Sequence, residues 1–273
     1  MTPKKVYDWQ NSSWDLRECP PHLALLPMGA TEQFGPHLPL ATQNLLLKAI
    51  SRRVADALSN SVYLLPPIPV GSSGQHQGFA GTVSLSWRTL MAVLSDLGES
   101  LLQTGTTRLA VLVGLGGAAC STTMPRENQI VKTAVRRLNY DHEELDAIWV
   151  QPLTVAHPPL DTLFDGPQDD VHAGQVVTSL MLHLHPDLVK ALPDPHIPPA
   201  GSEEYLHQLP FSALCPDGVW GRPDLADAER GREALQAAVA GTTAYIEETF
   251  VDLARLRNKR ARGFQKPLGS LHL

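Results

Sequence analysis

The chain has 273 residues, 43% of them hydrophobic and 18% charged, an ordinary composition for a globular protein large enough to bury a core without disulfides. Its 22 basic and 28 acidic residues give a net charge of −6, which argues against a protein that coats nucleic acid or anionic lipid. The three cysteines are far apart and no apolar run reaches the ~20 residues of a membrane span, so we expect a cytoplasmic protein with no nucleic-acid and no membrane partner.

Short apolar runs alternate with longer amphipathic stretches along the chain. Strands are predicted over residues 22–28, 62–70, 108–113 and 147–152, and helices over residues 43–58, 85–103, 127–138, 173–185 and 225–250. Because Pro66, Pro67 and Pro69 interrupt the second of these runs, its end cannot be a central strand. This alternation predicts a three-layer α/β fold, with a mainly parallel sheet and helices on both faces. Since no linker or repeat divides the chain, we expect a single domain over residues 1–273.

The segments that follow the predicted strands are rich in glycine, proline and polar residues. They cover residues 29–37, 71–81, 114–120 and 157–172. In a parallel sheet the chemistry lies at the carboxyl ends of the strands, so these segments should form the functional site. Residues 193–210 are proline-rich and predict a surface loop or lid.

Four segments carry an unusual pattern. They read PMGATEQFGPHLPLATQ (27–43), QHQGFAGTVSL (75–85), VGLGGA (113–118) and HAGQVVTSLML (172–182). In this order and at these spacings, they resemble the creatininase (creatinine amidohydrolase) family. The resemblance implies a creatininase-like fold and hydrolysis of C–N bonds in cyclic amides, formamides or peptides. It also implies two zinc or manganese ions that activate a water, and a ring-like homo-oligomer, commonly a hexamer.

The chain departs from this family at most of the positions that would hold the ions. The resemblance places a ligand carboxylate at Glu32, which is kept, but a histidine where Phe34 stands and a bridging aspartate where Gln43 stands. It places another ligand histidine at Leu115 and a glutamate at Gln175. Phenylalanine and leucine cannot bind a hard cation, and glutamine brings no charge. No metal cofactor is therefore expected, with zinc or manganese as the alternative.

Three polar residues remain candidates for catalysis in the pocket. Glu32, His76 and His172 could act as acid or base groups near neutral pH. The alternative is that Glu32 hydrogen-bonds the glycine-rich turn and that the histidines hold loops in place. The whole set expected to line the ligand pocket is Glu32, Phe34, His37, Gln43, His76, Leu115, Gly116, Gly117, His172 and Gln175.

Two main functions and a third hypothesis stay open at this point. The loss of ligands favours a pseudoenzyme that binds a small amide-like ligand or a partner protein without metal, because a fold alone does not establish chemistry. The alternative is an amidohydrolase with an altered or mononuclear site built from Glu32, His37, His76 or His172. A metal-free enzyme with new chemistry in the old pocket is a third hypothesis.

Overall fold

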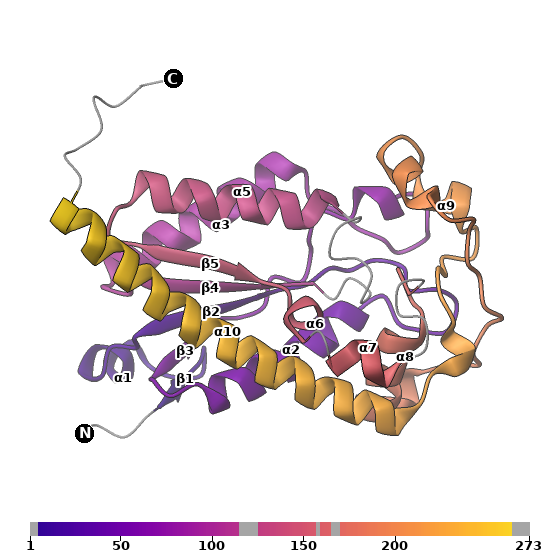
Figure 1. Ribbon diagram of the computed structural model, residues 1–273, viewed down its shortest axis with the longest axis horizontal. Coiled ribbons are helices and arrows are strands. Elements are labelled where there is room, and N and C mark those ends of the chain that lie inside the picture. Colours follow the sequence, from indigo (N-terminus) through magenta and orange to yellow (C-terminus); the bar gives the residue numbers. More distant parts are fainter. Residues whose placement is uncertain (1–4, 115–124, 157–158, 165–169, 264–273) are drawn as a thin grey trace.

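A five-stranded parallel sheet forms the centre of the protein in a computed structural model that describes residues 5–114, 125–156, 159–164 and 170–263. The strands lie in the order β1-β3-β2-β4-β5 (Figure 1). Their bounds are β1 Val6–Tyr7, β2 Leu23–Met28, β3 Val62–Leu64, β4 Arg108–Val113 and β5 Asp146–Val150. Leu25 pairs with Ala110, and Ala110 with Ile148, which fixes the register of the three strands β2, β4 and β5.

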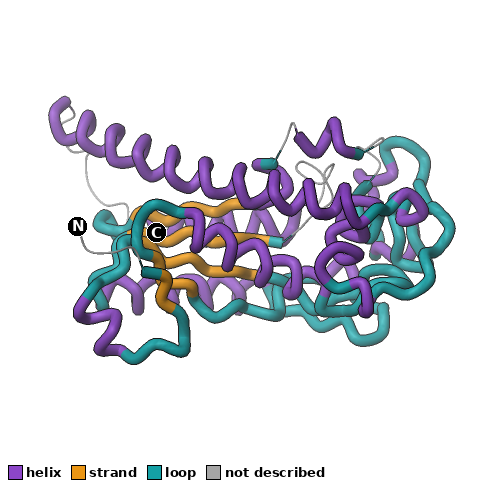
Figure 2. The backbone as a smooth tube through the Cα atoms, turned by 90° about the horizontal axis from the view of Figure 1, so that it is seen from below, coloured by secondary structure: helices purple, strands orange, loops and turns teal. Residues whose placement is uncertain are grey.

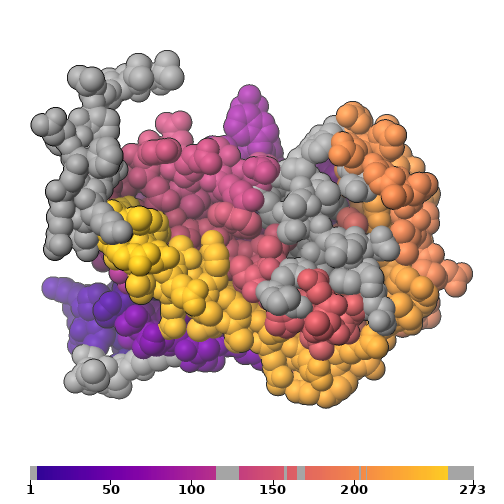
Figure 3. Space-filling view, in the orientation of Figure 1, coloured from indigo at the N-terminus to yellow at the C-terminus, as the bar shows by residue number. Residues whose placement is uncertain are grey.

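Long helices cover both faces of this sheet (Figure 2). They are α2 Thr42–Ala57, α8 Gln175–Leu184 and α10 Ala228–Gly263 on one face, and α3 Trp87–Gln103 and α5 Pro125–Asp141 on the other. Each face of the sheet has its own hydrophobic core, and successive strand residues point alternately into one and the other. Leu25 belongs to the core shared with α2 and α10, whereas Leu26 belongs to the core shared with α3 and α5. Figure 3 shows α10 running across one face of the molecule.

Short helices and turns gather mostly where the strands end (Figure 1). They are η1 Gly74–His76, α6 Pro152–Val155, α7 Pro159–Leu163, η3 Pro186–Leu188, η4 Ser202–His207, α9 Phe211–Leu214 and η5 Pro223–Leu225. At the opposite end lies α1, Ser13–Glu18, which begins with a capping box between Ser12 and Asp15. The site-bearing loops therefore lie on one end of the sheet.

The predicted fold class is confirmed, and the differences are local. Strand β3 ends at Leu64, before the prolines that interrupt the predicted run, since Pro66 cannot continue the ladder. The last helix begins at Ala228 rather than at residue 225, because a 3-10 turn over Pro223–Leu225 precedes it. Strand β1 and helix α1 were not predicted, because their apolar patterns are too short to detect, and neither were the short helices α6, α7 and α9. The proline-rich segment is tied to the body where His196 and Gly221 exchange both backbone hydrogen bonds.

None of the described helices is long and apolar enough to span a bilayer.

A close approach of two helices depends on Gly231 in α10. A Cβ atom at this position would lie 2.0 Å from the carbonyl oxygen of Ser179 in α8. Because this obstacle is backbone, the helices would have to separate, and we expect Gly231→Ala to reduce the free energy of unfolding by about 2 kcal/mol or more. Urea denaturation measures the loss, with Gly74→Ala as the control, since a Cβ at Gly74 meets no atom within 4 Å. A loss no larger than that of the control would contradict this packing.

Candidate functional site

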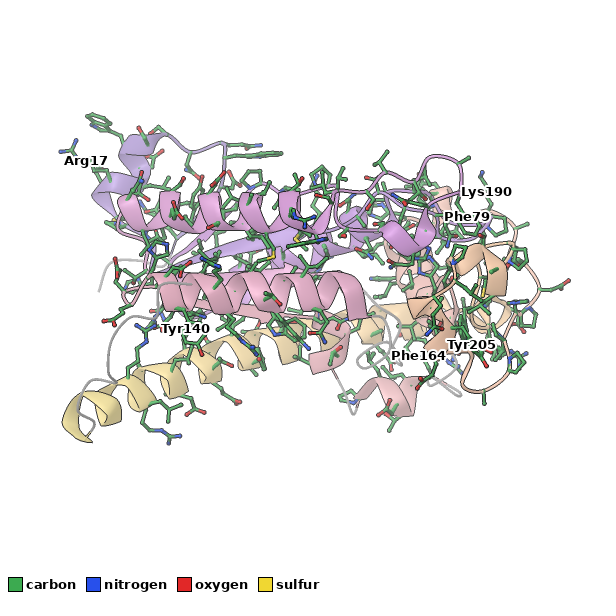
Figure 4. The ribbon with its side chains drawn as sticks, turned by 90° about the horizontal axis from the view of Figure 1, so that it is seen from above. Arg17, Phe79, Tyr140, Phe164, Lys190 and Tyr205 are labelled. Carbon is green, nitrogen blue, oxygen red and sulfur yellow. The ribbon has the colours of Figure 1, made fainter. Side chains whose placement is uncertain are left out.

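Three loops at the carboxyl end of the sheet bring the candidate catalytic residues together. Glu32 follows β2, and its backbone nitrogen donates to the carbonyl of Leu40. His76 lies in the short helix η1 that follows β3. His172 precedes α8 and exchanges both backbone hydrogen bonds with Trp220. In Figure 4, Phe79, Lys190 and Tyr205 mark this end of the molecule, and Arg17 marks the opposite end.

The side chains of Glu32, His76 and His172 form one buried cluster. Each offers an oxygen or nitrogen atom that could bind a metal, and these atoms lie within 4.8 Å of one another. All three side chains are almost completely inaccessible to solvent. The structure thus joins the three residues that the sequence named as catalytic candidates.

Aromatic rings pack tightly around the two imidazoles. Phe34 and His76 both stack on the ring of His172, each with a centroid distance of 4.4 Å and planes inclined by 27° and 29°. Phe211 of α9 contacts both histidines, at 4.8 Å from His76 and 5.2 Å from His172. Phe34 is 1% exposed, so this ring fills space inside the cluster.

The carboxylate of Glu32 has neutral partners. Its Oε1 accepts a hydrogen bond from the Gln43 Nε2 amide at 3.1 Å. Burial raises the pKa of Glu32 to about 7, and the neighbouring Ser73 hydroxyl acts in the opposite direction. Because burial is the larger effect, a substantial fraction of Glu32 is protonated at neutral pH.

Burial also keeps the histidines uncharged. It lowers the pKa of His172 to about 4, although the hydrogen bond to the Gln33 carbonyl acts in the opposite direction. The pKa of His76 lies well below its usual value, first through burial and then through repulsion from His172. The pKa of His37 falls to about 4 for the same first reason. The imidazoles of His37, His76 and His172 are therefore neutral at physiological pH.

The other described residues predicted to line the pocket lie outside the cluster of Glu32, His76 and His172. His37 lies outside the three-residue cluster and shares a hydrogen bond of 2.9 Å with Thr178 of α8, which ties the first loop to that helix. Gln43 also lies against the end of β4, where a Cβ at Gly114 would meet its Oε1 at 2.8 Å. Gln175 is buried at the start of α8. Leu115, Gly116 and Gly117 fall outside the described residues.

Sequence reasoning missed four residues that build this site. Gln33, Ser73 and Phe211 contact the cluster directly. Asp170 is fully buried and accepts the backbone N–H of Val176 at 2.7 Å, which anchors the start of α8 behind His172. The first two lie beside named motif residues, so their positions gave a signal. Asp170 lies within the predicted site segment 157–172, two residues before His172, but was not singled out, and nothing in the local pattern around Phe211 indicated a role.

The residues present do not fit the two-ion centre that the family resemblance implies. Phe34 has no donor atom, and Gln43 directs an N–H group, not a lone pair, at Glu32. Gln175 adds no charge, so the described residues give a pair of ions a single carboxylate from the implied set. One ion would meet three donor atoms, those of Glu32, His76 and His172.

Comparison with known proteins agrees with the fold and the motifs. The family model described as "Creatinine amidohydrolase" matches residues 11–246. The chain is 32% identical over 230 residues to a "Mycofactocin precursor peptide peptidase" of Mycobacterium ulcerans, covering 79% of this chain and 80% of the relative. It is 27% identical over 243 residues to a "Creatinine amidohydrolase" of Pseudomonas putida, covering 83% and 89%. A solved structure described as "Creatininase Mn" superposes with a TM-score of 0.71 at 25% identity, over 90% of this chain and 99% of that one. The chain therefore belongs to the creatininase family.

Proposed function

We propose that this protein binds a small amide-like ligand in the creatininase pocket without a metal cofactor and without the hydrolysis that two metal ions support. The contact between Gln43 and Glu32 carries the proposal. At the position where the family resemblance places a bridging aspartate, Gln43 presents a neutral N–H group to Glu32, and a neutral amide gives two ions no charge compensation. Glu32 Oε1 thereby accepts a hydrogen bond from a neutral group.

The same substitutions suit a pocket that holds no cation. Two or three carboxylates packed together without a metal would repel one another and raise each other's pKa. Where the family resemblance places an aspartate, Gln43 keeps a polar, hydrogen-bonding side chain but removes the charge. Phe34 adds an apolar ring that stacks on His172 at 4.4 Å. The result is a buried cluster of mixed apolar and polar side chains, the kind of surface that small-molecule sites present to a ligand.

An amidohydrolase with a single metal ion is the second candidate. The proximity of donor atoms on Glu32, His76 and His172 favours it. Relatives are named as a peptidase and an amidohydrolase, which supports C–N bond hydrolysis as the ancestral chemistry. A bound zinc or manganese ion would polarise the amide carbonyl and lower the pKa of a water. In this arrangement Glu32 and the two histidines would hold the ion.

Binding and turnover assays with the same compounds separate the two candidates. Formamide, 2-pyrrolidone and glycylglycine amide are offered to the full chain with and without added Zn²⁺ or Mn²⁺. We expect calorimetry to detect binding of at least one compound, weakened at least tenfold by His172→Ala, and no hydrolysis under either condition. Metal-dependent hydrolysis that disappears in Glu32→Gln would overturn the proposal and establish the second candidate. Absence of binding by all three compounds would also contradict it.

We propose further that the chain works as a single-domain, cytoplasmic homo-oligomer, a hexamer by family resemblance. Light scattering coupled to size-exclusion chromatography tests the assembly. We expect a mass about six times the 29.7 kDa of one chain. A monomeric mass at micromolar concentration would contradict the proposal.

A further inference from the structure

A cavity of about 430 Å³ lies at the amino end of the sheet, away from the carboxyl end that holds the candidate catalytic cluster (Figure 1). It lies between the starts of strands β2, β3 and β4 and the second half of α10, and we call it the amino-end cavity. Cavities of this size hold small molecules in many proteins. Its apolar wall includes Leu58, Val62, Ile246, Phe250, Val251 and Ala254. The cavity therefore has the room and the apolar surface for a small organic ligand.

Arg108 brings a positive charge to this apolar cavity. It is the first residue of β4 and is half-buried. Its guanidinium lies over the ring of Phe250, 5.4 Å from the ring centroid. In the described part of the chain, no side-chain hydrogen bond or ion pair of Arg108 accompanies this stacking. Because a stacked guanidinium keeps its N–H groups around its edge, these groups are available to an acceptor in the cavity.

Two carboxylates lie in the same region, and each has a partner other than Arg108. Asp146 is the residue opposite Arg108 in the ladder of β4 and β5, but its Oδ1 lies 2.8 Å from Nη2 of Arg257 in α10. Glu247 lines the cavity, and its Oε1 accepts hydrogen bonds from the backbone N–H and the hydroxyl of Ser59. A half-buried cation without an acceptor is costly, so the charge of Arg108 favours an anion from outside the chain.

The charges around the cavity favour a singly charged anion. Among the described residues that line it, Arg108 is the one arginine or lysine. Glu247 adds a negative charge to the same lining, which would repel a doubly charged phosphate more strongly than a carboxylate. A carboxylate can also accept two parallel hydrogen bonds from a guanidinium.

We propose that the amino-end cavity is a second ligand site, which binds a small carboxylic acid with an apolar body, such as a short fatty acid. The carboxylate of the ligand pairs with the guanidinium of Arg108. Its body packs against the apolar wall, including Val62 and Ile246, and so leaves water. The site lies apart from the candidate catalytic cluster and does not depend on the proposed metal-free function.

Calorimetry with four small probes tests the ligand class on the full chain. Hexanoate has both the carboxylate and the apolar body, acetate has only the carboxylate, and 1-hexanol has only the body. We expect one-to-one binding of hexanoate, about tenfold or more tighter than the binding of acetate or 1-hexanol. Inorganic phosphate, the fourth probe, should bind more weakly than hexanoate.

Arg108→Gln removes the charge and keeps an unbranched polar side chain. It should weaken the binding of hexanoate about tenfold or more, because the carboxylate loses its charged partner. Arg88→Gln is the matched control, since Arg88 also stacks on an aromatic ring, that of Trp87 at 4.3 Å, but lies in α3 outside the cavity. His172→Ala should also leave hexanoate binding unchanged, which separates this site from the candidate catalytic cluster.

Ala254→Phe tests the cavity without changing its charge. A phenyl ring at this lining position should fill the space for the ligand body and abolish hexanoate binding, although Arg108 is still present. Methyl NMR of the wild type locates the ligand. Hexanoate should shift the signals of Val62 and Ile246, which line the cavity, and leave those of Val219, in the loops at the other end of the sheet, unchanged. Circular dichroism checks that each variant is folded.

The carboxylate site is wrong if hexanoate does not bind, or if folded Arg108→Gln or Ala254→Phe binds it as tightly as the wild type does. Tighter binding of inorganic phosphate than of hexanoate would also overturn it. If Arg108→Gln does not fold, Ala254→Phe and the methyl signals of Val62 and Ile246 decide the question. None of these results affects the metal-free pocket, which rests on residues at the other end of the sheet.

Discussion

Replacing Phe34 with alanine is expected to reduce the free energy of unfolding by about 3–5 kcal/mol, the usual cost of removing a fully buried aromatic side chain. The ring is 1% exposed, stacks on His172 at 4.4 Å and belongs to the larger hydrophobic core. At the position where the family resemblance places a metal ligand, this chain has a core residue. Urea denaturation followed by circular dichroism measures the loss.

Phe79→Ala is the matched control for this prediction. Phe79 lies in the neighbouring loop and is only half-buried, so its loss should cost about 1 kcal/mol or less. If Phe34→Ala costs no more than the control, the ring does not fill the former ligand space, and the packing account of the cluster fails.

Glu32→Gln should make the protein more stable at pH 8 than the wild type, on the order of 3 kcal/mol, while the two proteins should be nearly equal at pH 5. Burial raises the pKa of Glu32 to about 7 from the usual 4.5. Between these values the folded chain holds a proton that the unfolded chain has lost, so the stability of the wild type falls as pH rises through this window. The glutamine side chain of the variant has no charge to bury. The lowered pKa values of His37 and His172 make stability rise with pH, opposite to the effect of Glu32. Both proteins contain these histidines, so their contribution cancels in the comparison.

A bound cation would reverse this result. It would stabilise the ionised Glu32, so that Glu32→Gln would destabilise the protein, and more so at pH 8. Denaturant unfolding at the two pH values is repeated with Glu248→Gln, an exposed carboxylate on α10 whose replacement should change stability by less than ~0.5 kcal/mol at either pH. A destabilising effect of Glu32→Gln that grows with pH would contradict the metal-free pocket.

The sequence predicted most of the fold because hydrophobic periodicity reports directly on packing. Strand β4 occupies the predicted residues, since an apolar run buried on both faces has sharp ends. Prediction was weakest where the chain has little pattern. The two residues of β1 are defined only by their pairing with β3, which is 56 residues away in the register Val6 to Val62. Such distant pairing leaves no local signal.

The sequence predicted which residues form the candidate site but not how they are arranged. Motif positions identified Glu32, His76 and His172, and the fold joins them. What the sequence could not supply was the arrangement of hydrogen bonds. The roles of Gln33 and Gln43 depend on which atoms face the histidines and Glu32, and that depends on three loops meeting. Phe211 reaches the cluster from a segment with no motif at all.

The metal content of the wild-type chain tests the central claim most directly. The protein is produced in cells grown with added zinc and manganese, dialysed against metal-free buffer and analysed by mass spectrometry of its elements, beside Glu32→Gln. The metal-free pocket predicts far less than one transition-metal ion per chain, with no difference between the two proteins. One or two ions retained per wild-type chain, and lost in Glu32→Gln, would contradict it.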